Sequence, residues 1–447
     1  MIRHCLGEVR RVHCGHMVLV FWIYRLLFIP LLLVIGPIQL WRARGRGSSQ
    51  RAFRHRRGLF PELPPKISGK KRVWLQAVSV GEMLAVQPVI DELVADPQVE
   101  VILTTTTVTS QEIARQRYEG KVMVLGFYPI DFWLWTARAW NRLQPDLMLL
   151  TEGEWWPEHI AQARRRGVPV LCMNARVSER SFRRMRVAGG LLPRIMRGLT
   201  RLLASSNTDA ERFLALGFSP QQVKLTGNIK VDIVISKLSA VQRAVLKAEL
   251  GFEADDVVVL GASTWPGEEA AMLKALQAVR TKTEQPVRLL LVPRHAERRD
   301  NVEAVVAATG LSYALRSRGE IGKPVEVCIA DTTGELQRLT QVADVVFVGK
   351  SLPPHRDGQT PVEAAGLGRA LIMGSGMSNF LSISQGLTDC GAAWRVADEA
   401  QLIEAVEALV LDPIERARRA ELGRGWHESN RGSLQLTLNE IRGFLAD

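Results

Sequence analysis

Cysteine is scarce in this 447-residue chain, which has five scattered residues: Cys5, Cys14, Cys172, Cys328 and Cys390. Their number is odd, and no two of them have the spacing of a Cys-x-x-Cys pair. A disulfide framework has a dense and usually even set of cysteines, and a structural zinc site has pairs with Cys-x-x-Cys-type spacing. The pattern therefore excludes both classes of site and predicts reduced, buried thiols in a cytoplasmic body.

The body of the chain also lacks the basic excess that nucleic-acid binding requires. The formal net charge is +12, but residues 1–72 contain 15 Lys and Arg against 2 Asp and Glu. Residues 73–447 contain 43 basic and 44 acidic side chains and are close to neutral. Because the excess is confined to one end, it indicates an anionic surface near the N-terminus and argues against a nucleic-acid partner.

Charge is almost absent from residues 17–41, where Arg25 is the one charged side chain. Roughly 20 apolar residues span a bilayer, and Arg25 could extend to the headgroups. Seven arginines and no acid follow in residues 42–57, which favours docking on anionic lipid at the cytoplasmic side. A cleaved signal peptide fits less well because no small-residue cleavage site follows. We expect an N-terminal anchor, either spanning or, because prolines interrupt it, monotopic.

Beyond residue 72, apolar strand-like runs alternate with helical patterns, which is typical of a parallel sheet covered on both faces. The length favours two domains, and two series of strands are present. The first series is predicted at 73–79, 99–106, 121–128, 147–150, 168–175, 201–206 and 223–228. The second is predicted at 257–263, 287–294, 325–332, 343–349 and 369–374, before a helical tail at 401–447. We therefore predict two doubly wound domains with a cleft between their carboxyl edges.

The turn after the first predicted strand carries Ser79, Gly81 and Glu82, and a helical pattern begins there. A carboxylate at this position lies at the carboxyl edge of the sheet, where open α/β sheets bind ligands. A Ser followed three residues later by Glu is also the pattern of a capping box, whose side chains only end the helix. The two interpretations are compatible, and these residues alone leave both open.

Polar and charged residues also follow the other predicted strands, as in an active cleft. They include Thr104–Thr107, Asp131, Thr151–Glu154, Asn174, Arg176, Asn228, Lys230, Ser263, Thr264, Arg294, His295, Asp331–Glu335, Lys350 and Ser351. No Asp-x-Asp metal pair ends a predicted strand. We therefore predict no metal site and no cofactor.

Nine short segments occur in an order that resembles one enzyme family. They are SVGE (79–82), TEGEWWP (151–157), NARVSERS (174–181), GNIK (227–230), ST with PGEE (263–269), PRHAER (293–298), DTTGEL (331–336), FVGKS (347–351) and P-x-E (361–363). Together with the N-terminal anchor, they resemble the 3-deoxy-D-manno-octulosonic acid (Kdo) transferase family over nearly the whole chain.

The resemblance implies an α/β fold of the GT-B type, with two Rossmann-like doubly wound domains facing a cleft and an N-terminal membrane-anchoring helix. It implies an anchor with a basic segment at 1–60, an acceptor domain at 61–235, and a nucleotide-sugar donor domain with C-terminal helices at 236–447. The implied activity is inverting, metal-independent transfer of Kdo from CMP-Kdo to a lipid A precursor, lipid IVA. This step of lipopolysaccharide core biosynthesis would take place on the cytoplasmic side of the inner membrane.

On the acceptor side, the resemblance places the catalytic base at Glu82, a carboxylate that is ionised near pH 7. Glu152 is also predicted to be catalytic, and Glu154 to order the acceptor side. Arg176 is a candidate for the donor carboxylate or an acceptor phosphate, with an ion pair to Glu152 or Glu154 as the alternative. The remaining predicted substrate-binding residues here are Ser79 and Gly81.

On the donor side, Arg294 suits an anion because a guanidinium binds carboxylate or phosphate oxygens in pairs. Ser263, Thr264 and Glu268 resemble the family's phosphate loop at a helix N-terminus. Glu363 would bind the ribose hydroxyls, or else be a favourable acid in a first helical turn. The other predicted substrate-binding residues are His295 (alternatively a turn residue), Gly334, Glu335, Ser351 and Asn379.

Several donor-side positions depart from the family's usual pattern. Lys350 replaces a Gly, Asp357–Thr360 replaces Gly-Gly-His-Asn, and Ser375–Gly376 replaces Pro-His. On the acceptor side, Gln76 replaces a His. Two alternatives follow: a related transferase that uses another nucleotide sugar, or an inactive lipid-binding homologue that kept only the acceptor half.

Overall fold

The computed structural model describes residues 22, 24–26, 28, 30, 50–187, 196, 198–233, 235–319 and 321–446. Contacts divide the chain into two compact units. Unit 1 comprises Met1–Ile229 and Gly432–Asp447, and unit 2 comprises Lys230–Arg431. Each unit is described below by itself.

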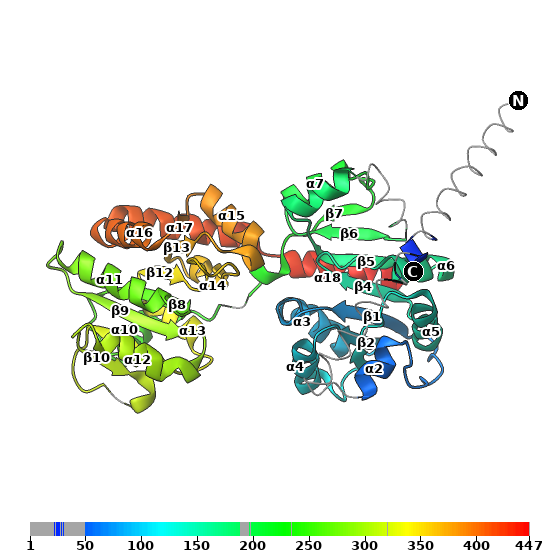
Figure 1. The fold of residues 1–447 in the computed structure, drawn as a ribbon, viewed down its shortest axis with the longest axis horizontal. Coiled ribbons are helices and arrows are strands. Elements are labelled where there is room, and N and C mark those ends of the chain that lie inside the picture. Colours follow the sequence, from blue (N-terminus) through cyan, green and yellow to red (C-terminus); the bar gives the residue numbers. More distant parts are fainter. Residues whose placement is uncertain are drawn as a thin grey trace, which may run out of the picture. The chain divides into compact units, whose positions relative to one another are not determined.

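Unit 1 is an α/β sandwich on one parallel sheet, with strand order β3-β2-β1-β4-β5-β6-β7 (Figure 1). Its strands are β1 (Lys71–Ala77), β2 (Val99–Thr105), β3 (Val124–Phe127), β4 (Leu147–Thr151), β5 (Val170–Ala175), β6 (Arg201–Ala204) and β7 (Val223–Leu225). Its helices are α2 (Gln50–Arg56), α3 (Val80–Ala95), α4 (Val108–Tyr118), α5 (Trp133–Leu143), α6 (Pro157–Arg166), α7 (Glu179–Val187), α9 (Asn207–Ala215) and α18 (Ser433–Ala446).

Unit 2 repeats this plan, with strand order β10-β11-β9-β8-β12-β13-β14. Its strands are β8 (Val257–Thr264), β9 (Val287–Pro293), β10 (Tyr313–Leu315), β11 (Val327–Ile329), β12 (Val345–Val348), β13 (Ala370–Gly374) and β14 (Ala393–Val396). Its helices are α10 (Ala240–Glu249), α11 (Glu268–Arg280), α12 (Arg299–Ala307), α13 (Leu336–Leu339), α14 (Val362–Gly366), α15 (Leu381–Asp389), α16 (Glu399–Leu411) and α17 (Pro413–Ser429).

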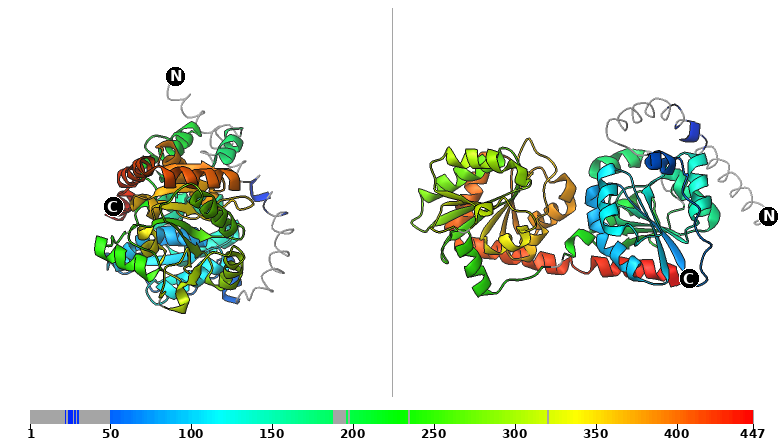
Figure 2. Two further views of the ribbon diagram at one scale, coloured as in Figure 1. Left: turned by 90° about the vertical axis from the view of Figure 1, so that its left-hand side faces the viewer. Right: turned by 90° about the horizontal axis from the view of Figure 1, so that it is seen from below.

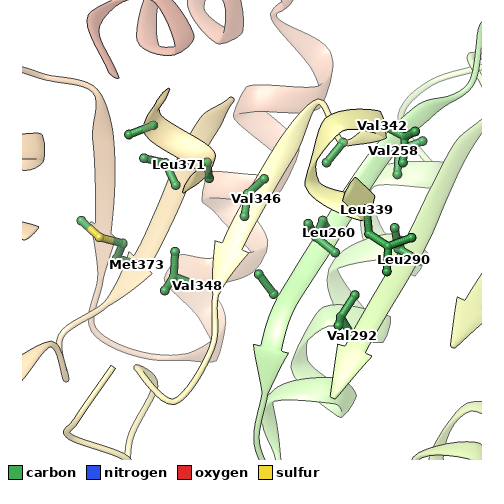
Figure 3. Close-up of a cluster of buried hydrophobic side chains, with 14 of the residues drawn as sticks. Val258, Leu260, Leu290, Val292, Leu339, Val342, Val346, Val348, Leu371 and Met373 are labelled. Carbon is green, nitrogen blue, oxygen red and sulfur yellow. The ribbon is translucent and has the colours of Figure 1, made fainter. Parts of the chain in front are cut away.

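Helices cover both faces of each sheet. Because successive side chains of a strand point to opposite sides, the side chains on both faces are buried. In β1, Val73 and Leu75 pack with α3, α4 and α18, whereas Trp74 packs with α5, α6 and α9. In unit 2, Val258 and Leu260 of β8 join the cluster shown in Figure 3, together with residues of β9, β12 and β13. The near-continuous apolar runs of the sequence are explained by this burial on two sides.

The structure differs from the predicted elements at the edges of the second sheet and at the C-terminus. Strands β10 and β14 were not predicted, and each contributes three or four residues to an edge of the sheet. The prediction placed every C-terminal helix in the second domain. Helix α18, the red helix along unit 1 in Figure 2, instead packs on unit 1 through Leu438 and Ile441.

Most of the predicted anchor, residues 17–41, lies outside the described residues, and the anchor stays a prediction. In the part of the chain that the structure describes, no helix is both long and apolar enough to cross a membrane. Arg25, expected near lipid headgroups, forms an ion pair with the buried Glu158, with an Nε–Oε1 distance of 2.5 Å. Tyr24 donates a hydrogen bond of 2.7 Å to Asp131. These contacts attach the N-terminal segment to unit 1.

Candidate functional site

The first part of the site is the turn between β1 and α3. Ser79 is the N-cap of α3, and its hydroxyl accepts a hydrogen bond of 3.3 Å from the amide of Glu82. The Glu82 carboxylate accepts from the amide of Val78, at 3.1 Å, one residue before the cap. Of the two capping-box hydrogen bonds, the one from the Glu82 amide to the Ser79 hydroxyl is present, whereas the Glu82 carboxylate accepts from the amide of Val78 instead of the amide of Ser79. The Glu82 carboxylate is thereby held at the carboxyl end of β1.

Three groups hold the Glu82 side chain, which is 8% exposed. Besides the Val78 amide, the hydroxyls of Ser79, at 3.1 Å, and of Thr151 donate hydrogen bonds to its oxygens. Burial raises the pKa of Glu82, and the charge of Glu152 adds to this, while the hydrogen bonds oppose it. A fixed carboxylate with a raised pKa at a sheet edge is suited to accept a proton.

Glu152 and Glu154 follow Thr151, the last residue of β4, which lies beside β1 in the sheet. Glu152 has a left-handed backbone conformation with φ of 53°, which turns the chain at the strand end. Burial, together with the charge of Glu82, raises the pKa of Glu154 to about 7. The three carboxylates that were predicted on the acceptor side are thus brought together, close enough to repel one another's charge.

Arg176 comes from the segment after β5 and pairs with Glu152, with an Nη2–Oε2 distance of 2.5 Å. The structure therefore shows the ion pair that was one of the two interpretations of Arg176. Gly81 is exposed in the first turn of α3, and a Cβ there would meet no atom nearer than the Ser79 hydroxyl at 3.9 Å. The backbone at the start of α3 is therefore open beside the carboxylates.

In unit 2, the predicted phosphate loop lies between β8 and α11. Ser263 has φ of 55°, and the Thr264 hydroxyl donates a hydrogen bond of 2.9 Å to Glu269. The buried Glu268 carboxylate accepts from the amides of Trp265, Lys350, Ser351 and Leu352, at 2.8–3.1 Å. Glu268 thus holds two loops together, and its oxygens are already occupied.

The loop after β12 is fixed in the same way. Ser351 is fully buried, and its hydroxyl bonds to the carbonyl of Val348 and the amide of Gly374. Lys350 lies over the Trp265 ring, with Nζ 4.4 Å from the centroid, and pairs with Asp357 at 2.7 Å. His295 packs edge-on against the same ring at 5.3 Å. The Lys350 ammonium is therefore already engaged by the Trp265 ring and the Asp357 carboxylate.

Two charged groups at this edge of unit 2 have no ion-pair or hydrogen-bond partner among the described residues. The guanidinium of Arg294, after β9, is exposed and makes no ion pair or hydrogen bond with the described residues. The Glu363 carboxylate, in the first turn of α14, likewise has no described partner, and burial raises its pKa. An unpaired cation and an unpaired acceptor are what an anionic sugar nucleotide would engage.

The remaining predicted donor residues are placed as follows. Glu335 forms an ion pair of 2.9 Å with Arg316 and accepts from Thr332. Gly334 before it adopts φ of 83°, which favours glycine. Asn379 is exposed, and its backbone N–H donates to the backbone carbonyl of Asp357. No group of three or more His, Cys, Asp or Glu among the described residues could hold a metal ion, and metal independence stays a prediction.

Comparison with known proteins identifies the family. The family model of 3-deoxy-D-manno-octulosonic acid transferase (kdotransferase) matches residues 51–233. A relative of that name from Bordetella pertussis is 34% identical over 382 residues, which is 83% of this chain and 87% of the relative. The chain belongs to the Kdo transferase family. The corresponding relative from Haemophilus influenzae is 30% identical, with the same coverage of both chains. The chain is thus a glycosyltransferase.

The fold is similar to those of two proteins whose solved structures contain UDP. The Anabaena protein HepE in complex with UDP matches 84% of this chain and all of its own, with a TM-score of 0.56 and 15% identity. Staphylococcus aureus MnaA with UDP matches 84% of this chain and 97% of its own, with a TM-score of 0.53 and 12% identity. This likeness confirms the α/β class with two parallel-sheet domains that resemble GT-B glycosyltransferases.

Thr151 and Trp265 were not predicted to have a role in this Kdo transferase family member. Thr151 belongs to the TEGEWWP segment but was assigned no function, because its bond to Glu82 depends on the pairing of β1 with β4. Trp265 lies between Thr264 and Pro266, inside a segment that was interpreted for its hydroxyls and glycine. A tryptophan in a phosphate loop is the signal that could have indicated a packing surface for Lys350.

Proposed function

We propose that the protein transfers Kdo from CMP-Kdo to a lipid A precursor, lipid IVA, with inversion at the sugar and without a metal. The step would belong to lipopolysaccharide core synthesis and would take place at the cytoplasmic face of the inner membrane. Membership of the Kdo transferase family supports the sugar and the acceptor class. The observation that carries the proposal is the buried Glu82 carboxylate at the carboxyl edge of the first sheet.

Glu82 would act as the general base. An acceptor hydroxyl attacks the anomeric carbon of Kdo as its proton passes to Glu82, the bond from that carbon to the CMP phosphate breaks, and CMP leaves. Attack on the face opposite the leaving group inverts the anomeric centre. The bonds from Val78, Ser79 and Thr151 fix the carboxylate before substrate binds, which reduces the reorganisation needed in the transition state.

The donor would bind to unit 2. CMP-Kdo carries a phosphate and a carboxylate, and the unpaired Arg294 offers a bidentate partner for either. Glu363 would accept hydrogen bonds from the ribose hydroxyls. The loops that carry Ser263 and Lys350 are fastened to each other by Glu268, so they would give the phosphate a pre-formed backbone surface.

Helix α2 supports a membrane surface as partner. Its Arg51 and Arg54 are exposed, the helix contains no acid, and the neighbouring Phe53 is 47% exposed. Basic residues attract anionic lipid by about 1 kcal/mol each near the surface, and exposed aromatic side chains suit the headgroup region. The predicted anchor precedes this helix in the chain, so both would place unit 1 at the bilayer.

The test is transfer of labelled Kdo, from CMP-Kdo generated in situ, to a tetra-acylated lipid A precursor by the purified chain in detergent. The anomeric configuration of the product is read by NMR, and CMP binding is measured in parallel. Labelled lipid of inverted configuration supports the proposal. CMP binding without transfer would indicate another sugar or acceptor. Loss of both would favour an inactive lipid-binding protein.

A further inference from the structure

Unit 2 has a second, cation-rich cavity at the edge of its sheet opposite the proposed donor site. Asp344 directly precedes β12 and Arg369 directly precedes β13, so both lie at the amino ends of strands. Ser263 and Arg294 lie at the carboxyl ends of β8 and β9. Because all these strands are parallel, the two sets of residues lie at opposite edges of one sheet.

The cavity has a volume of about 500 Å³, is open to solvent on one side, and is lined by residues of α10, of α17 and of the amino ends of the two strands. Pockets that bind small molecules fall in the range of roughly 300–1,000 Å³. Five cationic side chains line it, namely Lys237, Arg243, Arg369, Arg416 and Arg424. The acidic residues in the lining are Asp344 and Glu421. The wall thus carries a net positive charge, although residues 73–447 as a whole are close to neutral.

Some of these charges are already used by the fold. Arg416 donates to the carbonyls of Leu409 and Val410 at the end of α16. Arg424 pairs with Glu421 at 2.6 Å. A carboxylate oxygen of Asp344 accepts the Val258 amide at 2.9 Å. Glu421 is therefore used by Arg424, and the charge of Asp344 acts on Arg369, so the five cations of the wall still outnumber its two acids.

Three cations remain without a full complement of partners. Lys237 and Arg243 make no ion pair with any described residue. Arg369 donates from Nη2 to the Gln341 carbonyl at 2.8 Å, and its Nε is buried without a described partner. Burial lowers the pKa of Arg369, the charge of Asp344 opposes this, and the charge of Arg243 adds to the lowering. The guanidinium groups of Arg243 and Arg369 both line the cavity and repel each other, so an anion bound between them would stabilise both.

We infer that this cavity binds a phosphate-bearing anion, at a site separate from the proposed donor site. Guanidinium forks match phosphate oxygens in a bidentate manner, and the Lys237 ammonium supplies a further point charge. Leu238 and Leu367 form an apolar part of the wall, which suits the organic portion of a phosphate ester. The ligand is either a soluble phosphate compound or the phosphate of a lipid headgroup.

The experiment is isothermal titration of the full chain, in detergent and with saturating CMP, with inorganic pyrophosphate. We expect saturable binding, weakened about tenfold or more in Lys237→Ala/Arg243→Ala, the factor for losing a charge-assisted hydrogen bond. Lys323→Ala removes an exposed cation elsewhere in unit 2 and should leave the affinity unchanged. Thermal unfolding checks that both variants are folded.

Two results would overturn the inference: no saturable binding, or binding that the double variant and Lys323→Ala weaken equally. A second arm adds vesicles of phosphatidylglycerol to the pyrophosphate complex. If phosphatidylglycerol vesicles displace pyrophosphate from the unmodified chain and phosphatidylcholine vesicles do not, the site is assigned to a lipid headgroup. Retention of pyrophosphate would assign it to a soluble phosphate compound. Both outcomes of this arm support the site.

Discussion

The hydroxyl of Thr151, at the end of β4, donates a hydrogen bond to the carboxylate of Glu82, at the start of α3. The two residues are 69 positions apart and meet because β1 pairs with β4 in the sheet. This bond favours the ionised carboxylate and opposes the effect of burial on its pKa. It therefore influences the pH range in which Glu82 can accept a proton.

Replacing Thr151 by Val should move the acidic limb of the kcat/KM profile to higher pH, by about one unit. Without the hydroxyl, the pKa of Glu82 rises, and less of the enzyme has an ionised base at a given acidic pH. Thr151→Ser keeps the donor and is the matched control. The dependence of kcat/KM on pH is measured for the unmodified chain and both variants. Identical acidic limbs in all three would show that the Thr151 bond does not influence the pKa of Glu82.

Glu154 should make the stability of unit 1 pH-dependent. Burial, with the charge of Glu82, raises its pKa from 4.5 to about 7, so the folded state favours the protonated carboxyl. The resulting stability is present below pH 4.5 and is lost as the pH rises through about 7. Glu154→Gln, which cannot ionise, should gain free energy of unfolding relative to the unmodified chain between pH 5 and pH 8.

We expect this gain to be about 2 kcal/mol, reduced by solvent screening because the side chain is partly exposed. Denaturant unfolding at the two pH values measures it. Glu211→Gln replaces an exposed glutamate of α9 and should show no such gain. A gain of equal size in both variants would mean that Glu154 does not titrate as described.

Arg25 should stabilise unit 1 through its ion pair with Glu158, whose side chain is 1% exposed. Arg25→Ala leaves a buried carboxylate without its partner, a loss that costs about 3 kcal/mol. The double variant Arg25→Ala/Glu158→Gln removes that charge and should recover part of the loss. Arg183→Ala breaks the exposed pair with Glu179 and should cost under about 1 kcal/mol.

The same contact bears on an N-terminal truncation that removes residues 1–41. Since Arg25 and Tyr24 bond to Glu158 and Asp131, the truncated chain should unfold at lower denaturant concentration than the full chain. Equal midpoints for the two chains would show that these contacts add nothing to stability.

Arg294→Ala should raise KM for CMP-Kdo by about tenfold with a smaller change in kcat, because it removes ground-state binding of an anion. The guanidinium is exposed and makes no ion pair or hydrogen bond with the described residues, so the fold should be unaffected. Steady-state kinetics with varied donor measure the effect, and Lys323→Ala controls for the loss of one exposed cation. An unchanged KM would exclude Arg294 from the donor site.

The sequence predicted the features that depend on local pattern. Apolar runs that alternate with helical periodicity predicted two parallel sheets, and Ser79 with Glu82 predicted a capped helix start at the sheet edge. Cys172 and Cys328 are free and buried, as the cysteine spacing indicated, whereas Cys390 is free but only partly buried. Each of these features is decided within a few residues or by residue periodicity, so a single chain suffices to recognise them.

Other features depend on which strands become neighbours. The Thr151–Glu82 bond forms only because β1 pairs with β4. The hydrogen bonds to Glu268 form only because the loop after β12 lies beside the start of α11. Strands β10 and β14 are too short to show alternation. Helix α18 was assigned to the wrong unit. Its sequence shows an apolar face but does not show that this face packs with α3 of unit 1.

The central claim is that Glu82 takes the proton from the acceptor hydroxyl. Its most direct test is the single-turnover rate of Kdo transfer by Glu82→Gln, with Glu211→Gln as the matched control and CMP binding measured for both. We expect a rate lowered by about 10²–10⁴-fold in Glu82→Gln, with CMP affinity and folding unchanged, and a normal rate in Glu211→Gln. A normal rate in Glu82→Gln would contradict the claim.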